Sequence, residues 1–424
     1  MLAKNFLLTI ALFAVLSAFA GRLTAQNDVI GLRDAIRFAL DENPQFSSFA
    51  FRAQALEGEL TTANLQPAIR VSGQIENLIG TGDLNWFQGT EFTLAMSRVI
   101  EFGGKLEARS DVVSRRQSLL TAEQRVLELD LIGEVTRRFI ELAASEQRRD
   151  LLLRSETILQ STFNAVDARV ESGRAPSAER FRANAALQMA RLAVQSAELD
   201  IAAARVRLSS LWNDLEPDFE SVTAQLLQFE ETIPVEALLA RLEKNPGVLI
   251  YADESRMRDA ELREARSRRS GDVDVSVGIR HLAELNDSAF TVQASMPLFN
   301  KRRASGAIET AKANLALVDS RRNEAVLRIS ASIIDLDFRR RQAAIEIQAI
   351  QSEVLPQLQS AMDETLSAFT SGRYSLLELS AAQTSLLQAE QNMIDAATRV
   401  HLLTAEIEQL SGTSITGSTL GENQ

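Results

Sequence analysis

The chain has 424 residues, of which 45% are hydrophobic, so it is long enough for two or three domains and a large core. Its net charge of -12 disfavours a nucleic-acid partner, because phosphate contacts need a basic face. The absence of cysteine excludes disulfides and thiolate metal ligands, and an aromatic content of only 5% favours long helices over a mainly β fold.

Residues 1–25 have the pattern of a secretory signal peptide. Lys4 supplies a positive start, residues 7–16 an apolar stretch, and residues 18–20 or 23–25 a small-residue cleavage site. A transmembrane anchor is the alternative, but the apolar stretch is short and no stop-transfer pattern follows it. Later in the chain no apolar run reaches about 18 residues, so we expect an exported protein without a membrane-spanning helix.

The first half of the remaining chain, 26–213, contains two kinds of pattern. Apolar residues recur at helical spacing, then at every second residue, then at helical spacing again, with seven-residue repeats that indicate coiled-coil packing. Asn43-Pro44 separates the first two helices, because proline disfavours helix in the residue before it. In chain order we predict two helices, two strands and a long helical hairpin, over 31–40, 46–65, 70–78, 90–99 and 104–211.

A connector over 214–234 leads to a second half, 235–410, that repeats the first. Three short sequences recur at a nearly constant offset: Asn43-Pro44 as Asn245-Pro246, Phe92-Thr93 as Phe290-Thr291, and Ser172-Gly173-Arg174 as Ser371-Gly372-Arg373. The second pair of strands is expected at about 272–281 and 289–297, and the second helical hairpin over 301–410. Residues 411–424 are polar and predict a disordered tail.

The two Ser-Gly-Arg sequences predict tight bends within the helical hairpins. Gly173 and Gly372 can adopt the left-handed conformation that ends a helix. Pro176 suits the first position of the helix that follows the first bend. After the second bend, Ser375 and Glu378 have the spacing of a capping box.

Each predicted strand has one apolar and one polar face. In an exported chain without a spanning helix, this pattern indicates transmembrane β-strands with lipid on one face and water on the other. Four strands leave open edges, which the hydrocarbon region does not tolerate, so several copies must share one barrel. The alternative is a sheet whose apolar face is covered by helices, in a non-channel periplasmic coiled-coil scaffold or adaptor protein. Trp86 and Phe87, between the first two strands, fit either an aromatic girdle or a plug inside the loop.

The order and spacing of these features resemble the TolC family of outer-membrane efflux proteins, in particular its heavy-metal, CzcC-like branch. The resemblance covers essentially the whole mature chain. It rests on the duplicated layout, the paired bends, residues 100–105 (Ile-Glu-Phe-Gly-Gly-Lys) and residues 297–300 (Pro-Leu-Phe-Asn). It implies a mainly α fold with four transmembrane β-strands. It also implies a homotrimer whose twelve strands form one outer-membrane barrel, continued in the periplasm by a twelve-helix barrel.

The same resemblance implies a function. The chain would be the passive exit duct of a tripartite, RND-type efflux system, with a periplasmic adaptor, an inner-membrane RND pump and outer-membrane lipid as its partners. The branch favours metal cations as cargo, while drug efflux and type I secretion stay open. Neither an enzymatic motif nor a cofactor is expected, and the two histidines, His281 and His401, have no metal-ligand spacing around them.

Candidate site residues follow from matching the bends to the family. The adaptor-docking candidates are Gly173, Arg174, Gly372, Arg373 and Tyr374. For the arginines and the tyrosine, ordinary solvated turn residues are the alternative. Glu179 and Glu378 fall at acidic positions of the periplasmic entrance, where three copies would attract cations. Glu378 also completes the capping box, and that role alone is the alternative. Ala381 stands where relatives carry a second entrance acid, so we expect a weaker gate.

Overall fold

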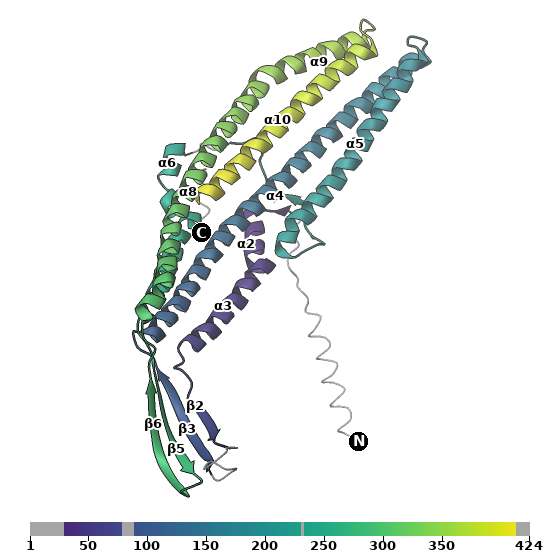
Figure 1. The fold of residues 1–424 in the computed structure, drawn as a ribbon. Helices are drawn as coiled ribbons and strands as arrows, with labels where there is room; N and C mark the ends of the chain where they lie inside the picture. Colours follow the sequence, from purple (N-terminus) through teal and green to yellow (C-terminus); the bar gives the residue numbers. More distant parts are fainter. Residues whose placement is uncertain (1–28, 79–88, 230–232, 413–424) are drawn as a thin grey trace, which may run out of the picture.

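The computed structural model describes residues 29–78, 89–229 and 233–412. The expected signal peptide, Trp86, Phe87 and the expected tail beyond residue 412 lie outside these ranges. Within them the chain is mainly helical and elongated, with a four-stranded sheet at one end and two helix bends at the other (Figure 1). None of the described helices is both long and apolar enough to cross a membrane.

The main elements occur in the same order in both halves: short helical segments before an Asn-Pro sequence, a longer helix, two strands and a helical hairpin. The first half contains β1 (Val29–Ile30), α2 (Leu32–Glu42), α3 (Pro44–Ala63), β2 (Arg70–Glu76), β3 (Glu91–Ile100), α4 (Lys105–Glu171), α5 (Ser177–Ser209) and η4 (Ser210–Trp212). The connector between the halves contains β4 (Ser221–Val222), which pairs in parallel with β1. The second half contains α6 (Val235–Leu239), η5 (Leu242–Lys244), α7 (Pro246–Ser267), β5 (Val273–Leu282), β6 (Asp287–Ser295), α8 (Asn300–Ala349), the π-helical turn η6 (Ile350–Val354), α9 (Leu355–Thr370) and α10 (Leu376–Ser411).

The repeated Asn-Pro sequence makes the same contacts in both halves. The side-chain oxygen of Asn43 caps the first turn of α3, and that of Asn245 caps the first turn of α7. The Nδ2 group of each asparagine donates to a backbone carbonyl near the end of the return helix, at Leu211 (2.8 Å) and Leu410 (2.9 Å). In each half this asparagine therefore joins the short helix to the end of the helical hairpin.

The helices lie side by side along the long axis of the molecule (Figure 1). The longest, α4, packs against α3 and α7 nearer the sheet and against α5 and α10 nearer the bends. Its counterpart α8 packs against α7 and α10. At mid-height a buried apolar cluster joins α2, α4, the end of α5 and the β1–β4 pair; its large members include Phe139, Leu142, Leu208, Trp212 and Phe219. A long helix is thus buried by different neighbours at each level.

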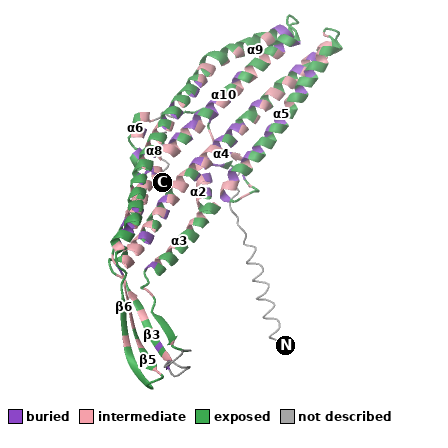
Figure 2. Ribbon diagram, in the orientation of Figure 1, coloured by how far each residue is buried: buried purple, intermediate pink, exposed green. Residues whose placement is uncertain are grey.

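The sheet has the order β2-β3-β5-β6 and is antiparallel throughout. Its register places Met96 between Val71 and Val277, so the apolar residues of neighbouring strands share one face. This face is bare, since Phe290 and Val292 are 88% and 77% exposed, and Figure 2 shows much of the sheet as exposed. The described helices lie beyond one end of the sheet (Figure 1). The alternative in which helices cover the apolar face is therefore wrong.

Local boundaries differ from the expectations. The first two strands are Arg70–Glu76 and Glu91–Ile100. The second pair is Val273–Leu282 and Asp287–Ser295, because the loop between them is shorter than expected and turns at Asn286, which has a φ of 47°. Helix α5 begins at Ser177, since Pro176 is extended (ψ 148°) and is the N-cap rather than the first helical residue. Helix α10 includes Ser411, so the expected tail cannot begin there.

The second helical hairpin contains a break that the sequence analysis did not predict. The π-helical turn Ile350–Val354 separates α8 from α9. Pro356 explains it, because proline lacks an N–H and its ring clashes with the carbonyl four residues earlier, at Ser352. Helix α4 runs to the first bend as one α-helix. The two hairpins are therefore not equivalent.

Candidate functional site: the paired helix bends

Both bends lie at the end of the molecule away from the sheet, and they share one backbone geometry (Figure 1). Gly173 follows α4 with a φ of 72°, and Gly372 follows α9 with a φ of 77°. In each bend the next residue donates its N–H to the carbonyl five residues earlier, at 2.8 Å. The pairs are Arg174 with Arg169 and Arg373 with Ala368. This pattern is the Schellman motif, so the predicted helix stops are confirmed.

The capping box predicted after the second bend is also confirmed. The Ser375 hydroxyl accepts a hydrogen bond from the N–H of Leu377 (3.2 Å), and the Glu378 carboxylate accepts one from the N–H of Ser375 (3.0 Å). Glu378 accepts a further hydrogen bond from the Ser375 hydroxyl. These hydrogen bonds, that of the hydroxyl above all, hold the pKa of Glu378 below its ordinary value. The side chain is exposed, so the cap presents an ionised carboxylate to solvent.

Glu179, the other acidic candidate, has different surroundings. It is half-buried, and its Oε2 atom is enclosed without a hydrogen-bond partner. The side chain lines a cavity of about 280 Å³, together with Arg182 of α5 and with Ser375 and Leu376 of the second bend. Glu179 therefore lies between the two hairpins, and the two predicted entrance acids are not equivalent within one chain.

The two bends are joined by contacts that sequence reasoning missed. Arg169 donates a hydrogen bond from Nη1 to the carbonyl of Phe369 (3.1 Å), and its guanidinium lies 4.5 Å from the centre of the Phe369 ring. Gln383 donates to the hydroxyl of Thr162 (2.9 Å). A buried apolar cluster fills the space beside them, with Val166, Ala183, Met362, Phe369, Leu376 and Leu379. Since Arg169 and Phe369 lie far apart in sequence, no local pattern could have revealed this contact.

The remaining bend candidates face solvent. Arg174, Arg373 and Tyr374 are exposed, Tyr374 by 47%. Arg373 donates from Nε to the Ser371 hydroxyl (3.1 Å), which holds it close to the bend. Ala381 is exposed on α10, one turn beyond Glu378, where an acid would lie on the same helix face. Of the predicted bend residues, two arginines, a tyrosine and the capping Glu378 are therefore exposed.

A larger cavity opens between the hairpins, farther from the bends. It measures about 440 Å³ and is lined from α4, α5, α9 and α10. Its walls combine charged side chains, among them Arg154, Asp363 and Glu390, with apolar ones such as Leu366. No local sequence pattern reveals this cavity, because its walls come from four separate helices.

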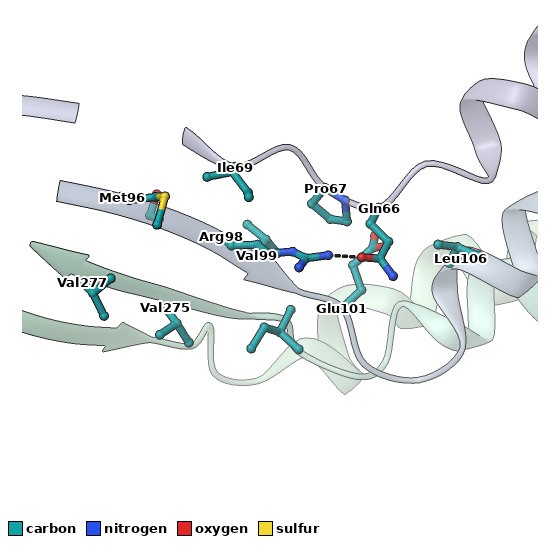
Figure 3. A pocket seen from close by; sticks show the side chains of 12 residues that line it. Gln66, Pro67, Ile69, Met96, Arg98, Val99, Glu101, Leu106, Val275 and Val277 are labelled. Atoms are coloured by element: carbon teal, nitrogen blue, oxygen red, sulfur yellow. Dashed lines mark hydrogen bonds between the residues drawn. The ribbon is translucent and has the colours of Figure 1, made fainter. Parts of the chain in front are cut away.

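A third cavity, of about 630 Å³, lies where the sheet meets the helices (Figure 3). The segment that follows α3 passes over the sheet here, and Pro67 and Ile69 line the cavity together with Met96 and Val275. Arg98 donates a hydrogen bond to the side chain of Gln66. By strand alternation Arg98 belongs to the apolar face of β3, so this bond satisfies a charged group at the edge of an apolar surface.

The two histidines lie in different surroundings. His401 is half-buried in α10, where Nε2–H donates to the Leu226 carbonyl (2.9 Å) and the ring stacks on Phe229. Burial lowers the pKa of His401, which keeps the ring neutral. His281 lies on β5 beside the hydroxyl of Ser288 (3.2 Å). Among the residues that the structure describes, no group of three or more histidine, aspartate or glutamate side chains could hold a metal ion.

Comparison with known proteins shows to which family the chain belongs. The family described as Outer membrane efflux protein matches residues 35–214 and 240–413, one range in each half of the chain. The chain belongs to this family. It is an outer-membrane efflux protein and not an enzyme, so the expected location and the expected lack of catalysis are confirmed by its family. The alternative of a non-channel periplasmic scaffold or adaptor is wrong.

Two relatives of this outer-membrane efflux protein come from Cupriavidus metallidurans. The chain is 23% identical to the cobalt-zinc-cadmium resistance protein CzcC over 384 residues, which are 90% of each chain. It is 28% identical to the nickel and cobalt resistance protein CnrC over 285 residues, which are 66% of this chain and 67% of CnrC. The predicted resemblance to the TolC family and its heavy-metal branch is therefore confirmed.

Solved structures confirm the fold. A membrane protein from Pseudomonas aeruginosa matches with a TM-score of 0.73 and 16% identity, over 92% of both chains. CusC matches with a TM-score of 0.73 and 16% identity, over 90% of this chain and 92% of CusC. VceC from Vibrio cholerae matches with a TM-score of 0.69 and 16% identity, over 91% of this chain and 96% of VceC. The efflux protein thus has the mainly helical fold with a four-stranded sheet that the sequence predicted.

Proposed function

We propose that this outer-membrane efflux protein is the passive exit duct of a tripartite, RND-type efflux system, that it works as a homotrimer, and that it carries metal cations. The observation that supports the duct most directly is the bare apolar face of the sheet. Its strands alternate between this face and a polar one. An apolar face of this extent is stable against lipid rather than water, while the opposite face can line an aqueous path.

Closure of the sheet supports the homotrimer. Strands β2 and β6 are the two edges, and their unpaired backbone groups are not tolerated in hydrocarbon. The smallest common barrels need about eight strands, so four strands cannot close alone. Three copies would supply twelve. The helices also have unpartnered apolar residues, such as Phe181 and Leu199 on α5 and Leu327 and Phe338 on α8, which a neighbouring copy would cover.

The bend end is the proposed docking site for the periplasmic adaptor, through which the inner-membrane pump delivers cargo. Gly173 and Gly372 shape the turns, and Arg174, Arg373 and Tyr374 are exposed on them. Charge reversal of both arginines should abolish chemical cross-linking to the cognate adaptor without changing trimer yield. Unchanged cross-linking would place the adaptor elsewhere.

The same end is the proposed periplasmic entrance. Three copies of Glu378 would surround it with ionised carboxylates, which attract cations. Glu179, held between the hairpins, contributes its charge from behind the mouth. Ala381 leaves this ring with fewer acids, so we expect a weak gate.

Metal cations are the proposed cargo because the relatives are resistance proteins for cobalt, zinc, cadmium and nickel. A passive duct does not need a metal-binding cluster, since passage requires weak interaction at every point. An acidic entrance and a net charge of -12 favour cations over anions.

Two experiments test the proposal. Purified protein in a planar lipid bilayer should form conducting trimers, and a protein that forms no conducting oligomer would overturn the duct. Deleting the gene should reduce tolerance to zinc, cobalt, cadmium, nickel or copper. Unchanged metal tolerance with raised drug sensitivity would instead assign drug efflux, and loss of a secreted protein would assign type I secretion.

A further inference from the structure

The polar face of the sheet brings two acidic residues into direct opposition. The register pairs Glu76 of β2 with Glu91 of β3, at the end of the sheet away from the helices. Like charges directly opposite each other on one face destabilise a strand pair. The repulsion between these two carboxylates therefore calls for a positive charge beside them.

Arg280 of β5 supplies the compensation. Its Nη1 atom lies 2.9 Å from Oε2 of Glu91, and its Nη2 atom lies 3.2 Å from Oε2 of Glu76. Its Nε–H donates to the hydroxyl of Thr93 (3.1 Å), which faces Arg280 in the register. One guanidinium therefore binds side chains of the adjacent strand β3 and, beyond it, of β2, and its donors are committed to Glu76, Glu91 and Thr93.

We infer that Arg280 sets the ion selectivity of the outer part of the duct, by neutralising two carboxylates that would otherwise face the water path. This inference rests on the proposed function, because it requires the polar face to line an aqueous lumen. Arg280, Glu76 and Glu91 remain partly exposed on that face, so ions in the lumen can sense their charges.

The charge balance of the polar face gives the direction of the effect. By strand alternation its ionised residues in β2, β3, β5 and β6 are Arg70, Glu76, Glu91, Asp274, Arg280 and Asp287. Two arginines and four carboxylates give the polar face a formal charge of -2 in each chain. Removing Arg280 would change the formal charge of this face to -3. Loss of this one side chain therefore makes the outer lumen more acidic and releases both glutamates from their partner.

The test measures the reversal potential of purified trimers in planar bilayers under a dilute KCl gradient. Arg280→Gln should raise the ratio of potassium to chloride permeability by about twofold or more, because charges are weakly screened at low ionic strength. Glu76→Gln combined with Glu91→Gln should shift the ratio in the opposite direction. Arg98→Gln is the matched control, since it removes the same charge from the apolar face and should leave the ratio unchanged.

Each outcome decides between explanations. If wild-type trimers conduct but Arg280→Gln leaves the reversal potential unchanged, Arg280 only holds the strands together and the inference is wrong. If wild-type protein does not conduct, the proposed function fails instead. Should Arg280→Gln not assemble, the glutamate pair carries the test, because an unshifted ratio in that variant would equally overturn the inference.

Discussion

Arg169 of α4 donates a hydrogen bond of 3.1 Å to the carbonyl of Phe369 at the end of α9, and its guanidinium lies 4.5 Å from the centre of the Phe369 ring. The Phe369 side chain is 1% exposed, within the apolar cluster shared by both hairpins. The bend of the second hairpin is therefore attached to the first hairpin through one charged side chain. This contact lies beside the proposed entrance, so it helps to fix the position of the second bend there.

Replacing Arg169 with alanine should loosen the second bend. The variant loses a hydrogen bond from a charged donor and a cation–π contact, together worth roughly 1–3 kcal/mol. We expect faster amide hydrogen exchange at residues 366–372 and a higher, more variable single-channel conductance. Arg339→Ala is the control, because Arg339 is exposed and its ion pair with Asp335 lies within its own helix. Exchange and conductance equal to wild type would show that the apolar cluster alone holds the hairpins together.

The two proposed roles of Glu378 can be separated by two substitutions. Glutamine at this position keeps an acceptor for the backbone of Ser375, whereas alanine removes it. Both variants should lower the cation selectivity of the channel. Only Glu378→Ala should also lower the midpoint of thermal unfolding, because it removes the acceptor that the Ser375 N–H uses in the capping box. Unchanged selectivity in Glu378→Gln would leave only the capping role.

The selectivity that depends on Glu378 should persist into acid. Its pKa is lowered by the Ser375 hydroxyl and by backbone N–H groups, so the carboxylate stays ionised below the pH at which an ordinary glutamate gains a proton. The stabilising contribution of the cap is present above the ordinary glutamate pKa and is lost as the pH falls through the lowered value. Ser375→Ala should move the loss of selectivity to higher pH. A pH series of reversal potentials measures this, and coincident curves would contradict it.

What the sequence could predict was local. Gly173, Gly372 and the Ser375–Glu378 pair form their turns and caps from neighbours within a few residues, so the sequence pattern was sufficient. The contact of Arg169 with Phe369 and the enclosure of Glu179 depend on how two distant hairpins pack, and no spacing encodes that. The π-helical turn had a local signal in Pro356, but its position depends on how the whole helix accommodates the missing hydrogen bond.

A glycine-to-alanine pair should separate the strain of a bend from ordinary helix propensity. Gly372 has a φ of 77°, so alanine there is strained even though open space surrounds it, and we expect a loss of about 1 kcal/mol. Gly306 lies inside α8, also with open space, so Gly306→Ala should gain about 0.5–1 kcal/mol. Thermal unfolding of the two variants should shift in opposite directions. A gain in both would mean that the bend relaxes without cost.

Glu146 offers a pH-dependent test of the mid-height core. The residue is only 9% exposed, its Oε1 has no hydrogen-bond partner, and its Oε2 accepts a long hydrogen bond of 3.4 Å from the N–H of Val222. Burial raises the pKa of Glu146, and this effect exceeds the opposing effects of the Val222 hydrogen bond and of the positive charges of Arg205 and Arg149. The ionised carboxylate therefore lowers the free energy of unfolding at neutral pH.

Glu146→Gln should raise the midpoint of thermal unfolding at neutral pH, because the amide can accept the same hydrogen bond without a buried charge. A folded-state pKa above the unfolded value means that the cost of ionisation is present above the folded pKa and disappears as the pH falls toward the ordinary glutamate value. The difference between variant and wild type should therefore shrink in mild acid. We expect a shift of about 2–4 °C at neutral pH, which corresponds to ~1 kcal/mol for a large domain. Thermal unfolding across a pH series measures it, and a destabilised variant at neutral pH would show that the electrostatic attraction of Arg205 and Arg149 to the carboxylate outweighs desolvation.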